Sequence, residues 1–152
     1  MWLHAVRRRG LQAQRLRGGA AGAAAASPRL LDAVPDGAGV RFVVEVNRCS
    51  SNRGLALHGI WPRAGVDCEG PQFSAEEVSS ILPEMEAYWT GCRTDPRQIR
   101  LLWAHEWHKH GTCSGMSQLQ YFEKGLELLS RYGGTWDRCR TNPCRVYLRD
   151  LP

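Results

Sequence analysis

With 152 residues, 43% of them hydrophobic, the chain is long enough and apolar enough to fold as one domain around its own core. A formal net charge of +5 is typical of nucleic-acid-binding proteins, but the excess lies within the first 50 residues, where eight arginines outnumber three acidic side chains. The remaining residues carry equal numbers of basic and acidic side chains, so charge alone identifies no partner. Because no run of eighteen apolar residues occurs, we expect no membrane-spanning segment in this sequence.

Residues 1–38 are rich in Arg, then in Gly and Ala, with no acidic residue before Asp32. This low-complexity composition predicts a disordered tail over 1–38 and a folded domain over 39–152. The tail lacks the apolar stretch of a clear signal peptide. An organelle transit peptide and a misassigned start of the reading frame both fit its composition.

Two strands are predicted first in the folded part. Residues 41–46 are rich in β-branched side chains, which favour extended structure. Residues 55–60 form a second apolar segment, which Trp61 and Pro62 bring to an end.

Three helical segments are predicted after the strands. A capping-box pattern at Ser74 and Glu77 predicts a helix to Leu82, and Pro83 then opens a further turn that runs to residue 89. A compact helix is expected over about 102–110, ended by a glycine.

A second capping-box pattern begins at Ser117. It precedes one apolar stripe at helical spacing, made of Leu119, Phe122, Leu126 and Leu129. Two glycines, at 133 and 134, are expected to close this helix, and residues 135–152 show no clear period.

Six cysteines in a domain of this size favour disulfides and an oxidising compartment over six reduced, buried thiols. The absence of a Cys-x-x-Cys pair argues against the usual structural zinc clusters. The six are Cys49, Cys68, Cys92, Cys113, Cys139 and Cys144.

The richest segment chemically is the predicted helix over 102–110. His105 and Lys109 lie four residues apart, as do Glu106 and His110, so the four side chains form one polar patch on a helix. Another face carries a pair of tryptophans that would anchor the helix in the core, Trp103 and Trp107.

Such a patch suits phosphoryl transfer, which needs cations near the phosphate oxygens together with an acid and a base. RNA supplies its own nucleophile, the 2′-hydroxyl, so neither a nucleophilic side chain nor a metal is required. The second proton-transfer group would be His58, the only histidine outside both the tail and the predicted helix over 102–110. A histidine suits this task because its pKa lies near working pH.

The motif LHGIWP at residues 57–62 resembles the first active-site motif of the ribonuclease T2 family, and HEWHKHGTC at 105–113 resembles the second. The intervening LPEMEAYW at 82–89 is also similar to family members, and the resemblance covers about 55–131, half of the chain. It implies an α+β fold with helices packed on an antiparallel central sheet that is incomplete in this chain.

The resemblance also implies a mechanism. His110 would act as general base on the 2′-hydroxyl and His58 as general acid to the leaving 5′-oxygen, while Glu106 orients or polarises. Lys109 and His105 would stabilise the pentacoordinate phosphate, and a base of the substrate would stack on the remaining site residue, Trp61.

Further implications are single-stranded RNA as the substrate, no action on DNA, no cofactor, no metal, no membrane association, a monomeric state and the secretory route, ending outside the cell or in a vacuole or lysosome. The family bridges the positions of Cys68 and Cys113, and by analogy to plant members those of Cys49 and Cys92. Cys139 and Cys144 match no family position, and the pairing considered for them is a local one with each other.

Other interpretations of these residues stay open. His58 alone could cap a strand, and Glu106 with Lys109 could form an ordinary helix ion pair. His105, His108 and Cys113 could hold zinc, although Lys109 would repel it and the H-E-x-x-H pattern fails at that position. His108, where family members often carry Glu, is expected to be a solvated surface residue.

The sequence also departs from the family. No Trp-Pro follows the first predicted strand, and only two strands of the sheet are recognisable before the chain reaches Pro152. We therefore expect Phe122 and Leu126 to face water, with low stability and weak activity. The alternative function is a catalytically inactive relative that only binds RNA or a partner.

Overall fold

The computed structural model describes residues 41–50 and 54–152, so the whole of the predicted tail over 1–38 lies outside the described residues. The described part has an antiparallel three-stranded sheet in the order β2-β1-β3, formed by β1 (Phe42–Arg48), β2 (Leu55–Pro62) and β3 (Cys144–Leu148). The helices are α1 (Leu82–Tyr88), α2 (Pro96–Lys109), α3 (Gln118–Arg131) and α4 (Gly133–Arg138), with short 3-10 turns η2 (Ser79–Ile81) and η3 (Gly111–Cys113). This confirms the predicted α+β class.

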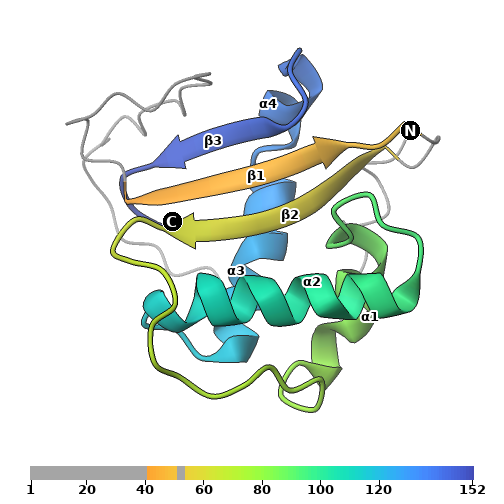
Figure 1. The fold of residues 1–152 in the computed structure, drawn as a ribbon. Helices are drawn as coiled ribbons and strands as arrows, with labels where there is room; N and C mark the ends of the chain where they lie inside the picture. The colour runs from red at the N-terminus through yellow and green to blue at the C-terminus, as the bar shows by residue number, and fades with distance from the viewer. Residues whose placement is uncertain (1–40, 51–53) are drawn as a thin grey trace, which may run out of the picture.

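Helix α3 packs against β1 and β2, and in Figure 1 it runs behind the sheet while α2 lies across the lower part of the molecule. The apolar cluster between them includes Val44, Leu57, Trp89 and Phe122, all fully buried. Among the described residues no helix is both long and apolar enough to cross a membrane.

The pairing of β1 with β2 is interrupted at the first active-site motif. Glu45 lies opposite Gly59 and Val46 opposite Leu57, so His58 is an extra residue on β2. Such a bulge redirects a side chain and is common beside active sites. The fold therefore turns His58 out of the regular alternation of the strand.

The helix expected over 74–82 is wrong. Residues 75–78 are turns and 79–81 are a 3-10 turn, so α1 begins only at Leu82. The backbone N–H of Ser74 is bound by the side chain of Gln118 at 2.8 Å, a tertiary contact that replaces the reciprocal capping bond.

The predicted start of the next helix, near residue 102, is also wrong. Helix α2 begins six residues earlier, because Asp95 accepts a hydrogen bond from the N–H of Arg97 and Pro96 occupies the first turn. By contrast, the capping box at Ser117 and Gln120 is present with both of its hydrogen bonds.

Beyond α3 the structure differs from the expectation in two ways. Gly133 and Gly134 begin α4 instead of only closing α3, and residues 144–148 form β3, which the sequence pattern did not reveal. The expectation that Phe122 faces water is wrong: the ring is fully buried, 4.8 Å from Trp89 and 5.7 Å from Phe73 between ring centroids. Leu126 is partly buried against the same core.

Candidate active site

His58 lies on the bulge of β2 with partners on both sides of its ring. Its Nδ1 is 3.0 Å from Oδ1 of Asn47 and 3.5 Å from Oε1 of Glu45, both on β1. Its Nε2 is 3.5 Å from Oε1 of Glu106 on α2. With its side chain 27% exposed, the imidazole is held by these groups and still reaches solvent.

Glu106 is the buried carboxylate at the centre of the site. It is 1% exposed, and its Oε2 accepts a 2.8 Å hydrogen bond from Nε1 of Trp61. Gly59 makes this approach possible, since a Cβ there would lie 2.0 Å from that same oxygen. The carboxylate thus faces β2 instead of forming an ion pair along its helix.

His110 caps the C-terminal end of α2 and lies over Trp61, with 5.4 Å between ring centroids and an interplanar angle of 32°. Burial lowers the pKa of His110 below 6.5, against an opposing effect of Glu106; the charges of Lys109 and His105 lower this pKa further. Its Nδ1 is buried with no hydrogen-bond partner. A neutral ring is favoured at this position.

Trp61 connects the two histidines. Its ring also makes an edge contact with His58, at 5.9 Å between centroids. Both imidazoles therefore touch one indole, whose orientation is fixed by Glu106.

The other predicted helix residues differ in exposure. His105 is exposed and Lys109 half-buried, and positive charge on either side chain lowers the pKa of His110. The side chain of His108 is 72% exposed, 3.9 Å from Asp67, as expected for a solvated residue.

Tyr121 on α3 bonds the backbone of both elements that carry the candidate site, β2 and α2. Its buried hydroxyl donates its proton to the carbonyl oxygen of Ile60 at 2.8 Å and shares it with that of Glu106 at 3.4 Å. Burial raises the pKa of this phenol well above its usual range, so it remains a donor. One side chain thus joins the strand and the helix that carry the candidate catalytic groups.

The sequence prediction missed three residues around His58, namely Glu45, Asn47 and Arg145. Glu45 is 5% exposed, and its Oε2 accepts a 2.7 Å hydrogen bond from Nε of Arg145 on β3. A charged residue within a β-branched run was the available signal, because a buried carboxylate needs a partner.

A comparison with known families decides the assignment. The sequence profile of the ribonuclease T2 family matches residues 41–140.

The chain belongs to the ribonuclease T2 family.

Among curated relatives, human "Ribonuclease T2" is 42% identical over 79 residues, which are 47% of this chain and 30% of that protein. "Ribonuclease Oy" of Magallana gigas is 33% identical over 91 residues, 52% of this chain and 42% of that protein. The matched residues thus span 30% to 42% of the length of these two relatives.

Solved structures agree on the fold. The crystal structure of human RNase T2 aligns with a TM-score of 0.53 and 30% identity, over 60% of this chain and 56% of that one. Ribonuclease MC1 from bitter gourd seeds aligns with a TM-score of 0.56 at 20% identity, over 70% of this chain and 86% of that one, a likeness of fold alone. The T2-like fold is therefore shown, and β3 lies beyond the residues that the family profile matches.

Disulfides fix the segments around the site of this T2-family chain. Cys68 pairs with Cys113, which ties the loop after β2 to the end of the second motif, and Cys49 pairs with Cys92. These are the two pairs that the family resemblance implied.

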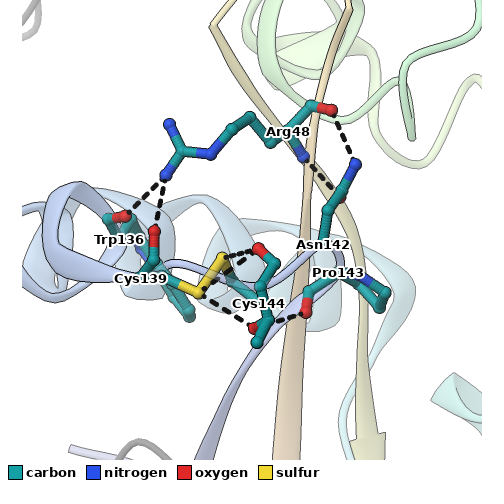
Figure 2. The surroundings of a disulfide bond; sticks show 7 residues. Arg48, Trp136, Cys139, Asn142, Pro143 and Cys144 are labelled. Carbon is teal, nitrogen blue, oxygen red and sulfur yellow. Dashed lines mark hydrogen bonds between the residues drawn. A yellow bond between two sulfur atoms is a disulfide. The ribbon is translucent and has the colours of Figure 1, made fainter.

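The third disulfide, Cys139–Cys144, secures β3 (Figure 2). Beside it, the guanidinium of Arg48 donates to the carbonyl oxygens of Trp136 and Cys139, and the side chain of Asn142 bonds the backbone of Arg48 through both its oxygen and its nitrogen. The local pairing considered for these cysteines is the one present.

The described part of the chain contains no group of three or more His, Cys, Asp or Glu side chains close enough to hold a metal ion. The zinc site considered for His105, His108 and Cys113 has no geometric support, since Cys113 is in a disulfide.

Proposed function

We propose that this chain is a metal-independent endoribonuclease that cleaves single-stranded RNA through its own 2′-hydroxyl. The observation that carries the proposal is the contact of two imidazoles, His58 and His110, with the single indole of Trp61 beside a buried carboxylate. Acid and base catalysis needs two such groups held at fixed separation. Membership of a ribonuclease family supports the same substrate class.

In the first step, His110 takes the proton of the 2′-hydroxyl and the 2′-oxygen attacks phosphorus. The bond from phosphorus to the 5′-oxygen breaks, and His58 gives a proton to that oxygen. The products are a 2′,3′-cyclic phosphate and a free 5′-hydroxyl; water then opens the ring with the two histidines in exchanged roles. The neutral ring favoured at His110 supports its assignment as the base.

The remaining groups have supporting roles in the proposal. Glu106 orients Trp61 and polarises His58, while Lys109 and His105 offset the charge that develops on the phosphate. The half-buried indole of Trp61 leaves part of its surface for a base of the substrate to stack on. A variant of RNase MC1, whose 26% identical structure is that of a complex with 5′-GMP, supports nucleotide binding in this fold.

The proposal includes the absence of a cofactor, no cleavage of DNA and a monomeric enzyme. We also propose the secretory route, to the exterior or to a vacuole or lysosome, because all six cysteines are in disulfides, which persist in oxidising compartments. The folded unit of the proposal is 39–152, preceded by the low-complexity tail.

The test is cleavage of a short single-stranded RNA by the oxidised chain. His58→Ala and His110→Ala should each lower turnover by ~10²–10⁴-fold. His108→Ala is the matched control, because this exposed histidine lies on the same helix and should leave the rate unchanged. Mass spectrometry should find the 2′,3′-cyclic phosphate, and a substrate with one 2′-deoxy sugar should be uncut at that position.

Excess EDTA should not change the rate, and loss of activity in EDTA would contradict the proposal. The alternative, an inactive relative that binds RNA or a partner, predicts no cleavage together with retained RNA binding. This alternative needs a direct test, because the chain spans less than half the length of these relatives. The same RNA, measured by binding and by cleavage, separates the two.

A further inference from the structure

Strand β3 lies beyond the residues matched by the family profile, yet it contributes a side chain to the candidate active site. In the antiparallel register, Arg145 of β3 stands opposite Glu45 of the central strand β1. Its Nε donates a 2.7 Å hydrogen bond to Oε2 of Glu45. On the other side of β1, Glu45 stands opposite Gly59, next to the bulge that carries His58.

The pair matters because Glu45 is both buried and close to the imidazole. Its second oxygen, Oε1, is 3.5 Å from Nδ1 of His58, while Asn47 bonds the same nitrogen at 3.0 Å. A buried carboxylate without a countercharge is strongly unfavourable. In the described structure Arg145 is the permanently charged partner of this carboxylate.

The guanidinium of Arg145 also reaches the indole between the two histidines. Its Cζ lies 5.7 Å from the ring centroid of Trp61, within the range of a cation–π contact. Arg145 therefore touches one residue that borders His58 and one that borders both histidines.

We infer that Arg145 is a positioning residue, which neutralises Glu45 so that His58 stays bonded to Asn47 and the site admits an anionic phosphodiester. The inference rests on the proposed function. Without the guanidinium, two buried carboxylates, Glu45 and Glu106, would border His58 with no compensating arginine. The uncompensated Glu45 would draw the imidazole toward itself and repel the phosphate.

A double-mutant cycle tests this, because Arg145 acts through Glu45 only if the two effects are coupled. Arg145→Gln should lower kcat/KM by about tenfold or more, whereas the same change in a Glu45→Gln background should lower it by less than about threefold. Because Glu45→Gln also removes the uncompensated charge, the double variant should be more active than Arg145→Gln alone. Arg149→Gln, at an exposed arginine just after β3, is the matched control and should have no effect.

A parallel measurement uses a 2′-O-methyl dinucleotide, which carries the phosphodiester but cannot be cleaved. Its Kd should rise about tenfold in Arg145→Gln and recover in the double variant. If the parent chain binds this probe but cuts no RNA, the proposed function fails while the binding cycle still tests Arg145.

Equal losses in both backgrounds would overturn the inference and assign Arg145 a direct contact with substrate, which its 44% exposed side chain permits. No loss in either background would overturn it as well. Should Arg145→Gln fail to fold by circular dichroism, Glu45→Gln is compared with the double variant; a difference above about threefold then contradicts the inference.

Discussion

A Cβ atom on Gly59 would lie 2.0 Å from Oε2 of Glu106. The carboxylate of the second motif therefore occupies the space that a side chain at this glycine of the first motif would fill. The same Cβ would lie 2.7 Å from Nε1 of Trp61. Two motifs that are separated in sequence thus meet through the absence of a side chain.

Gly59→Ala should therefore displace Glu106 and Trp61 together. Overpacking of this kind costs ~1–3 kcal/mol of unfolding free energy. The loss in kcat/KM, expressed as an activation free energy, should be larger than this loss of stability, because both groups position the histidines. Thermal melts and RNA cleavage measure the two effects. Gly134→Ala, where a Cβ meets nothing within 4 Å, is the control and should not lower activity.

The acid side of the pH profile should reflect His110. A general base works in its neutral form, and burial lowers the pKa of this imidazole below 6.5. The half-maximum of kcat/KM on the acid side should accordingly lie below pH 6.5, which would keep the enzyme active in a mildly acidic compartment. An NMR titration of the His110 ring gives an independent value, and Lys109→Gln should raise it, because the positive charge of Lys109 lowers the pKa of His110.

The lowered pKa of His110 also has a consequence for stability. The unfolded chain binds the proton more tightly than the folded chain, so His110 destabilises the fold as pH falls from about 6.5 toward the lower, folded-state pKa. Urea melts across this range should show a smaller loss of stability in His110→Asn than in the parent. A loss of the same size in both would contradict the linkage.

Tyr121→Phe should loosen the connection between strand and helix. Removing the hydroxyl leaves the carbonyl of Ile60 without its 2.8 Å partner, at a cost of ~1–3 kcal/mol. Chemical denaturation measures the loss. Tyr132→Phe is the control, since Tyr132 is only half-buried and its hydroxyl makes no hydrogen bond to the residues that the structure describes.

The disulfides should differ in their contribution. On the loop-entropy relation, removing Cys68–Cys113, which closes 45 residues, costs ~4 kcal/mol, whereas removing Cys139–Cys144, which closes 5, costs ~2 kcal/mol. Paired Cys→Ser variants compared by denaturation test the order, and peptide mapping under non-reducing conditions tests the pairing. A free thiol at Cys113 would contradict the structure.

Local patterns predicted the parts of the fold that depend on neighbouring residues. The capping box at Ser117 and the two first strands follow from propensity and periodicity over a few positions. The tryptophans Trp103 and Trp107 are buried, as their spacing indicated. The Asp95-Pro96 pair is a local signal for the true start of α2, which lies six residues before the predicted start.

Features set by distant contacts escaped the sequence prediction. Strand β3 is only five residues long and its pairing with β1 joins positions about 100 residues apart, so no local pattern announces it. The bulge at His58 depends on the register of two strands, and the partnership of Glu45 with Arg145 depends on that register and on β3. No helix begins at Ser74, because the backbone N–H of Ser74 donates to the side chain of Gln118 on α3 instead of to a capping partner.

The sheet order also sets a sequence of events during synthesis. Strands β1 and β2 are joined by a short connection and can pair as a hairpin soon after leaving the ribosome, but β1 must wait for residues 144–148 before its other edge is filled. Until then Glu45 has no arginine, and the candidate site has only one of its two supporting edges. A chain proposed to cut RNA is thus synthesised on the ribosome with its candidate site unfinished until β3 has paired with β1.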